Sequence, residues 1–191
     1  MSKLFVDQVD PKTATTLTLG TSGDTISIPS GVTIANAGTA TGFGENNTPA
    51  FIAKYSGSGS GFANGTYVKL SFDSEVYDSG SVYDNSAYRF TPGVTGKYFL
   101  YARMIFQAGS TSPNQTRIAI YKNGSVTSYY RWTTATTMSD ASMQISLVDD
   151  CTSTSDYYEA YAYQSNASSS TTFTIGDSGH TNLFYGYRII T

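Results

Sequence analysis

Residues 97–106 have the sequence Lys97-Tyr98-Phe99-Leu100-Tyr101-Ala102-Arg103-Met104-Ile105-Phe106. Successive side chains of a β-strand point to opposite faces, so the even-numbered positions of this segment form one apolar face. The odd-numbered face is also largely apolar, because Phe99, Tyr101 and Ile105 lie on it. A strand in an ordinary β-sandwich buries one face and alternates apolar with polar residues. The segment therefore predicts a sheet that is covered twice, by the opposite sheet and by neighbouring subunits.

The last apolar segment of the chain has the same two-sided character. Leu183, Tyr185 and Tyr187 alternate there with Phe184 and Gly186. Burial of such side chains between subunits, at about 25 cal/mol per Å² of apolar surface, favours an oligomer over a monomer that exposes them. A tyrosine-rich face in contact with solvent is the alternative, because tyrosine tolerates exposure. We expect a homotrimer interface in the head formed by Phe99, Tyr101, Ile105, Phe184 and Ile190.

The composition of the 191-residue chain favours an all-β protein. It contains 16 Tyr, 10 Phe and 18 Gly, which are residue types typical of half-buried strands joined by tight turns. The length allows one medium domain with a short appendage, since a single core is usually built from about 100–150 residues. Charged residues make up only 13% of the chain and the net charge is -3, so we expect no nucleic-acid partner.

Turn-forming residues recur at short intervals after Thr48, which is typical of a sandwich or jelly roll. Asn64-Gly65, Pro92-Gly93 and Asn123-Gly124 are examples. We predict ten strands in this part of the chain, near residues 50–56, 66–72, 86–91, 95–108, 116–122, 126–132, 142–149, 156–164, 171–175 and 182–190.

Residues 1–45 are built differently, from short Thr-, Ser- and Gly-rich segments at 15–20, 25–29 and 32–34 in which apolar and polar residues alternate. Strands of this length bury too little surface to offset the entropy lost when they are ordered. We therefore predict a trimeric stalk or attachment segment, in which copies of the chain share a core formed by Leu17, Leu19, Ile26 and Ile28. A flexible tail is the alternative. The jelly-roll head is expected to span residues 46–191.

The chain has no recognisable signal peptide and no run of about 20 apolar residues, so we expect it to fold in a cytoplasm without membrane insertion. Cys151 is the only cysteine, which excludes an intrachain disulfide. Burial, strand pairing and association are left to stabilise the fold.

Four segments resemble the globular heads of complement and tumour necrosis factor. Residues 83–101 resemble the complement-head signature, in which an Asx and an aromatic residue precede Phe and then Gly-x-Tyr-x-Phe-x-aromatic. Residues 118–124 resemble the apolar strand of that family that ends in Lys-Asn-Gly. Residues 146–149 with 157–163 resemble its next strand pair, and residues 184–187 its final Phe-x-Gly-aromatic strand.

These matches come in family order and cover roughly residues 48–191. Leu100 stands where the family prefers Phe, and Ala102 where it prefers an aromatic residue, so a more distant jelly roll is the alternative. The resemblance implies a ten-stranded jelly-roll sandwich assembled as a compact homotrimer. It also implies that loops at the apex or on the flanks bind the ligand.

The N-terminal segment shows a second resemblance. Residues 4–12 and 17–31 are similar to the starts of tail-fibre and related virion proteins of tailed bacteriophages. This similarity covers a short segment and implies a virion protein that is assembled in a bacterial cytoplasm and released by lysis.

Residues able to support catalysis are few. His180 is the sole histidine, and no Gly-x-Ser-x-Gly elbow accompanies it. Nothing in the sequence pairs it with Cys151, and one histidine with one cysteine cannot form a zinc site. We expect no catalytic site, with a loop role for His180 and a structural role for Cys151.

Acidic residues gather in two turn-rich stretches. Loop carboxylates can bind calcium, but their spacing here is not that of an EF-hand, and no motif supports a catalytic carboxylate pair. We expect solvated turn carboxylates and no metal or cofactor, with a structural calcium ion as the alternative. The residues are Asp73, Glu75, Asp78 and Asp84 in the first stretch and Asp149, Asp150 and Asp156 in the second.

These observations favour a bacteriophage tail fibre, in which residues 1–45 bind other virion proteins and the head binds host-surface polysaccharide. Aromatic rings stack on sugars while neighbouring amides and hydroxyls form hydrogen bonds. A capsid decoration or head-fibre protein without a receptor role and a surface-polysaccharide depolymerase are the alternatives. The candidate glycan-binding residues, each of which has packing as an alternative role, are Tyr129, Tyr130, Trp132, Tyr77 and Tyr83.

Overall fold

The computed structural model describes residues 9, 15–35, 37, 47–56, 60–107, 113–135, 140–165, 173–175 and 182–189. The chain divides into two compact units, residues 1–43 and 44–191. We call the second unit the head. Its described residues form thirteen strands and no helix, in agreement with the all-β prediction. Among the residues placed by the structure, there is no helix that could cross a membrane.

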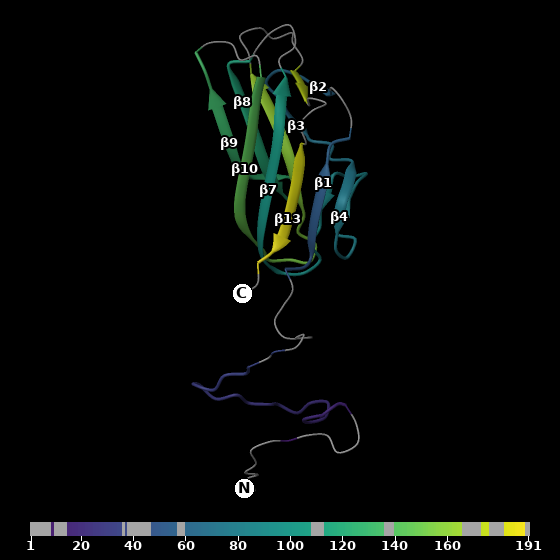
Figure 1. Ribbon diagram of the computed structural model, residues 1–191. Coiled ribbons are helices and arrows are strands. Elements are labelled where there is room, and N and C mark those ends of the chain that lie inside the picture. Colours follow the sequence, from purple (N-terminus) through teal and green to yellow (C-terminus); the bar gives the residue numbers. More distant parts are fainter. Residues whose placement is uncertain are drawn as a thin grey trace. The chain divides into compact units, whose positions relative to one another are not determined.

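Sheet A forms one layer of the head, and it faces the viewer in Figure 1. All of its strand pairs are antiparallel. Its five main strands, in spatial order, are β10 (Asp140–Cys151), β7 (Gly96–Gln107), β13 (Leu183–Arg188), β1 (Ala50–Lys54) and β4 (Ser74–Asp78). The short strands β12 (Phe173–Ile175) and β2 (Ser60–Phe62) extend the sheet beside the end of β7.

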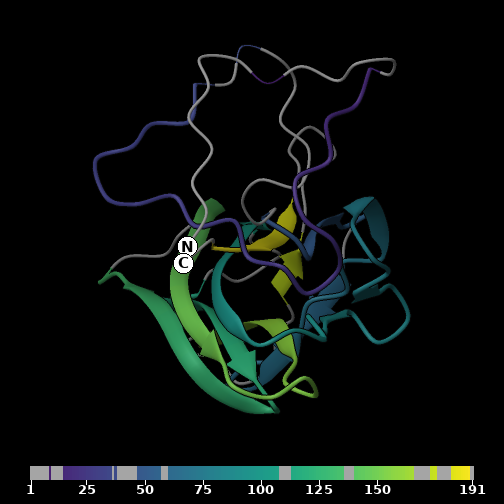
Figure 2. The same cartoon turned by 90° about the horizontal axis from the view of Figure 1, so that it is seen from below.

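Sheet B forms the second layer and is likewise antiparallel. Its central strands are β9 (Ser125–Thr133), β8 (Gln115–Lys122) and β11 (Tyr158–Ser165). The other edge of β11 pairs with β3 (Tyr67–Lys69) and β6 (Arg89–Phe90), and β6 pairs with β5 (Tyr83–Asp84). Figure 2 shows the head from the end at which β13 finishes.

The core lies between the two sheets. The ring of Phe51 on β1 stacks on Phe90 of β6 with centroids 4.4 Å apart, and it meets Phe184 of β13 edge-on at 4.9 Å. The predicted inner face of β7 is confirmed, because each of its even-numbered side chains is buried. The largest fully buried side chains are Tyr98, Tyr158, Phe51, Phe72, Phe90, Phe106, Phe184, Leu100, Met104, Ile118 and Ile120.

The β8–β9 hairpin sets the register of one edge of sheet B. Its turn residues Asn123 and Gly124 both have positive φ, 52° and 76°, as a type I′ turn requires. The pairing then shifts by one residue at a bulge between Ile120 and Tyr121. The bulge fixes which side chains of β9 lie opposite those of β8.

All ten predicted strands have a counterpart in the structure, and three strands were not predicted. β2 and β5 are only three and two residues long. β4 contains acidic residues and lies at the edge of sheet A, so its sequence resembles a turn more than a strand.

Residues 15–35 of the N-terminal unit form no strand in the single chain. The stalk predicted there requires three copies of the chain to share a core, so it stays a prediction. The residue pair Thr21 and Asp24 closes a turn, in which the backbone N and Oγ1 of Thr21 donate to Asp24 Oδ2 at 2.7 and 2.9 Å. The predicted stalk residues Leu17, Leu19, Ile26 and Ile28 are all exposed. In an isolated chain no further layer of side chains covers these residues. This agrees with the expectation that segments of this length cannot form a core without a partner.

Candidate binding surfaces

Four aromatic rings lie on the outer face of sheet A, away from the core. Phe99 of β7 lies opposite Tyr187 of β13, and Tyr101 lies opposite Tyr185. The centroids of the first pair are 5.3 Å apart and those of the second 4.8 Å, with both pairs stacked. We call Phe99, Tyr101, Tyr185 and Tyr187 the aromatic face.

Apolar side chains continue the aromatic face on both sides. Val148 of β10 lies opposite Phe99, and its side chain is 56% exposed. Ile52 of β1 lies opposite Tyr185 and, on its other side, opposite Tyr77 of β4. The four rings are half-buried in the single chain, so part of their apolar surface faces solvent. This is the two-sided sheet that residues 97–106 predicted.

The predicted interface residues of the head are only partly on this face. Phe99 and Tyr101 lie on it, but Phe184 is 0% exposed and packs in the core, so its place in the predicted interface is wrong. Strand parity explains the error: Tyr185, not its neighbour, points outward. Ile105 retains 8% exposure and is largely covered within its own chain. Ile190 lies outside the described residues.

The outer face of sheet B has a different character. One row across this sheet consists of Tyr67 (β3), Tyr163 (β11), Arg117 (β8) and Arg131 (β9). The guanidinium carbon of Arg117 is 4.5 Å from the ring centroid of Tyr163, 5.3 Å from that of Tyr129 and 5.9 Å from that of Tyr67. Such cation–π contacts hold the guanidinium over the rings. We call these five residues the arginine–tyrosine platform.

Hydrogen bonds fix the orientation of Arg117 on the platform. Its Nη1 donates to Tyr67 Oη at 3.1 Å, and its Nε and Nη2 donate to Gln115 Oε1 at 3.0 and 2.7 Å. The bond to Tyr67 is the main reason why the pKa of Arg117 lies above its usual value. In the described part of the chain, no carboxylate forms an ion pair with Arg117.

Two further tyrosines extend the platform along sheet B. The rings of Tyr121 and Tyr161 stack with centroids 4.0 Å apart. Tyr161 donates its hydroxyl to Glu159 Oε2 at 3.2 Å, and Glu159 also forms an ion pair with Lys69. Burial, reinforced by Glu159, raises the pKa of Tyr161 to about 12, so its hydroxyl stays protonated and can donate.

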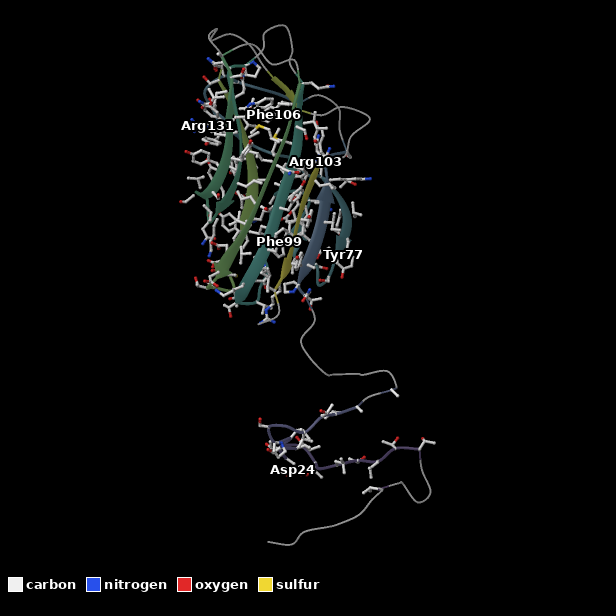
Figure 3. The ribbon with its side chains drawn as sticks, turned by 60° about the vertical axis from the view of Figure 1, so that its left-hand side comes forward. Asp24, Tyr77, Phe99, Arg103, Phe106 and Arg131 are labelled. Atoms are coloured by element: carbon white, nitrogen blue, oxygen red, sulfur yellow. The ribbon has the colours of Figure 1, made fainter. Side chains whose placement is uncertain are left out.

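The five predicted glycan-binding residues do not form one site. Tyr129 belongs to the platform, while Tyr130 and Trp132 lie on the opposite face of β9 and are also exposed. Tyr77 is 50% exposed and lies on β4, on the opposite side of the head from Arg131 in Figure 3. Tyr83 is buried, and its hydroxyl donates to the Phe72 carbonyl at 2.8 Å, so its proposed binding role is wrong.

The first acidic stretch is occupied in holding turns. Asp73 accepts from the backbone N and Oγ of Ser56, at 2.8 and 2.9 Å. Asp78 accepts from the backbone N of Val82 and Tyr83, both at 3.0 Å. Asp84 accepts from the Oγ and backbone N of Ser86 and from the backbone N of Ala87, and these bonds, above all the one from Ser86 Oγ, lower its pKa to about 2. Each of these three carboxylates thus has a structural hydrogen-bond partner.

The second acidic stretch surrounds Lys122. Its Nζ is 2.9 Å from Asp149 Oδ2 and 3.4 Å from Asp156 Oδ2. Asp156 also accepts from the Nδ2 of Asn123 at 2.8 Å and from the backbone N of Thr152 at 2.9 Å. The described residues contain no cluster of His, Cys, Asp and Glu that could hold a metal ion.

Cys151, the only cysteine and thus the only candidate thiol nucleophile, is buried. The thiol of Cys151 is buried near the Ser153 carbonyl oxygen, 3.2 Å from Sγ, and burial raises the pKa of the thiol. A raised thiol pKa lowers the fraction of reactive thiolate. His180 lies outside the described residues.

No protein-family model and no curated protein sequence matches the chain. Solved structures do match the head. Murine APRIL aligns with a TM-score of 0.54 and 11% identity over 73% of this chain and 98% of its own. The tumour necrosis factor Eiger from S. frugiperda aligns at 0.52 and 8%, over 73% and 91% of the two chains. The globular domain of zebrafish complement 1qA protein aligns at 0.51 and 13%, over 74% and 96%. The head therefore has the jelly-roll fold of the tumour necrosis factor and complement heads, as the sequence motifs predicted.

Proposed function

We propose that this chain is a non-catalytic, homotrimeric binding protein whose head recognises glycans, and that it serves as a tail fibre of a bacteriophage particle. The aromatic face is the observation that supports assembly into a trimer. If an oligomer buried a further ~50 Å² of apolar surface on each of the four rings, about 5 kcal/mol would be gained per chain. That gain favours assembly over a monomer with exposed rings.

A second exposed apolar surface supports a ring of subunits rather than a symmetric pair. Tyr130 and Trp132 are exposed on β9, which is the edge strand of sheet B. Contact between this edge of one chain and the aromatic face of the next would join two unlike surfaces, and repeated contacts of that kind close into a ring. Three subunits per ring is the assembly implied by the resemblance to complement and tumour necrosis factor heads.

A binding role is favoured over catalysis because the residues that could act as catalysts already have structural roles. The carboxylates of both acidic stretches are engaged in turns and ion pairs, and the only cysteine is buried. The exposed aromatic residues, by contrast, offer flat rings with hydroxyl groups at their edges, which suit sugar recognition. These features support an adhesin rather than a depolymerase.

The place of the protein in a phage particle is supported by the N-terminal unit. Its sequence is similar to the starts of tail-fibre proteins, and its apolar side chains at positions 17, 19, 26 and 28 are exposed in the single chain. Exposed apolar residues in a stretch that forms no strand, as residues 15–35 do in the single chain, suit association, either with two further copies or with another virion protein. The head would then project from the particle and contact the host surface.

Purified, fluorescently labelled protein incubated with bacterial cells tests this function. We expect saturable binding that is competed by polysaccharide extracted from the same cells, with no release of oligosaccharides over hours. A protein that binds neither cells nor extracted polysaccharide from any host tested would contradict the glycan-binding role. Release of oligosaccharides would instead identify a depolymerase.

A further inference from the structure

We infer that the arginine–tyrosine platform binds an acidic polysaccharide, that is, a sugar chain that carries carboxylates. The inference rests on the proposed glycan-binding function and adds to it the chemical class of the glycan and the surface that holds it. The platform lies on the outer face of sheet B, whereas the proposed subunit contact uses the aromatic face of sheet A and the side chains Tyr130 and Trp132 on the opposite face of β9. A bound glycan and the subunit contact would therefore use different surfaces.

The platform carries an unbalanced positive charge. Arg117 and Arg131 lie directly opposite each other in the β8–β9 pairing, a placement that puts like charges together and destabilises a sheet. Neither arginine forms an ion pair with a carboxylate among the described residues. An anionic ligand would compensate both charges at once.

The charge of the whole face supports the same conclusion. Besides the two arginines, the charged residues that face outward on β3, β8, β9 and β11 are Lys69 and Glu159. Three cations and one anion give this face a charge of +2, although the whole chain has a net charge of -3. The face therefore attracts anions against the overall sign of the protein.

Arg117 is held in a geometry that leaves part of its guanidinium able to donate to a ligand. A guanidinium has five N–H donors, and three hydrogen bonds connect Arg117 to Gln115 and Tyr67. The remaining donors, with those of the exposed Arg131, are suited to bidentate hydrogen bonds with a carboxylate. Tyr129 and Tyr163 supply rings beside the cations on which the apolar face of a sugar can stack.

An acidic sugar chain matches both the arginines and the tyrosine rings of the platform. A neutral glycan would stack on the rings and leave the arginines unmatched. A nucleic acid would match the arginines, but its many phosphates would meet a single row of cations on an acidic protein, which gives little of the electrostatic attraction that such binding needs.

The test is calorimetric titration of the full-length protein with polygalacturonate and with the same polymer after its carboxylates have been reduced to alcohols. We expect saturable binding to the acidic polymer and at least about tenfold weaker binding to the reduced one, because charge-assisted hydrogen bonds are lost. Arg131→Gln and Arg117→Gln should each weaken binding to polygalacturonate at least about tenfold. Arg117→Lys, which keeps the charge and loses the planar fork, should lie between wild type and Arg117→Gln.

Arg89→Gln is the matched control. Arg89 also lies over a tyrosine ring, with its guanidinium carbon 4.9 Å from the centroid of Tyr157, but it is outside the platform. This variant removes one charge and one cation–π contact and should bind polygalacturonate as the wild type does. The oligomer mass and unfolding temperature of every variant identify a loss that arises from misfolding, and Arg131, which is exposed, provides a second test if Arg117→Gln does not fold.

Three results would overturn the inference. Equal affinity for both polymers would exclude recognition of carboxylates, while the proposed glycan-binding function would stand. Unchanged binding by Arg117→Gln and Arg131→Gln would place the site elsewhere on the head. Displacement of the polymer by single-stranded DNA at equal charge concentration would assign the platform to nucleic acid. Failure to bind any host polysaccharide would instead contradict the proposed function itself.

Discussion

Tyr101 of β7 and Tyr185 of β13 stack across the outer face of sheet A, with ring centroids 4.8 Å apart and planes inclined by 28°. The Tyr101 hydroxyl donates to Gln144 Oε1 of β10 at 2.9 Å, so the stack is also tied to the third strand of the sheet. Two half-buried rings that support each other on a sheet surface form a preorganised apolar patch. Such a patch loses little conformational entropy when a second chain covers it.

Removal of one ring from this patch should weaken assembly. Tyr185→Ser is expected to raise the protein concentration needed for trimer formation at least about tenfold, because even ~50 Å² of lost apolar burial per chain is about 1.3 kcal/mol. Light scattering after size-exclusion chromatography measures the change. Tyr129→Ser, on the outer face of sheet B, is the control and should leave the mass unchanged. Equal dissociation of both variants would contradict an interface on the aromatic face.

A side chain at Gly186 should be poorly tolerated. A Cβ at this position would lie 2.7 Å from Leu100 Cδ2 and 2.9 Å from the Phe99 carbonyl oxygen. Gly186→Ala is therefore expected to lower the free energy of unfolding by about 1–3 kcal/mol, as overpacking does, in chemical denaturation. The cost should shrink in a Leu100→Val background, which removes the nearer atom. A loss below about 0.5 kcal/mol in the wild-type background would show that β13 can move away from β7.

The stability of the head should depend on Asp156 at acid pH. Hydrogen bonds, above all that from Asn123, lower the pKa of Asp156 to about 2 from its ordinary value of 3.8. A carboxyl group with a depressed folded-state pKa stabilises the fold above the unfolded-state value, and this contribution is lost as the pH falls through the folded-state value. The free energy of unfolding should therefore fall between about pH 4 and pH 2, and less steeply in Asp156→Asn. Equal slopes in the wild type and in Asp156→Asn would contradict the role of Asp156.

The structural role of Tyr83 is testable by removal of its hydroxyl. Tyr83→Phe leaves the buried Phe72 carbonyl without its donor, which should cost about 1–2 kcal/mol of stability with no effect on glycan binding. Burial also raises the pKa of Tyr83 above its ordinary value, so the hydroxyl remains a donor at neutral pH. Tyr77→Phe, at a half-exposed position, should be neutral in thermal unfolding. Equal stability of the two variants would contradict the buried hydrogen bond.

The sequence predicted the fold well because its strongest signals are local. Residues 97–106 showed two apolar faces, and Asn123-Gly124 indicated a hairpin turn, and both are present. The orientation of the last strand could not be predicted in the same way. When both faces of a strand are apolar, the pattern does not say which one enters the core. Phe184 was therefore assigned to the subunit interface, whereas in the structure Phe184 lies in the core and Tyr185 on the outer face.

The platform was missed for a related reason. A two-residue turn at Asn123-Gly124 with regular pairing would place Arg117 opposite Tyr130. The bulge after Ile120 shifts the register by one residue and brings Arg131 to that position. A single inserted residue of this kind has no clear sequence signal, although it decides which side chains share a face. The row of Tyr67, Tyr163 and Arg117 also depends on long-range pairing of β3, β11 and β8.

Sedimentation equilibrium of the full-length protein at micromolar concentration tests most directly whether chains assemble through the aromatic face. We expect one species of three times the chain mass of 20.5 kDa, stable on tenfold dilution. A stable species of 20.5 kDa across the same concentrations would contradict this assembly, because the half-buried rings of the aromatic face would then keep their outer surfaces in solvent.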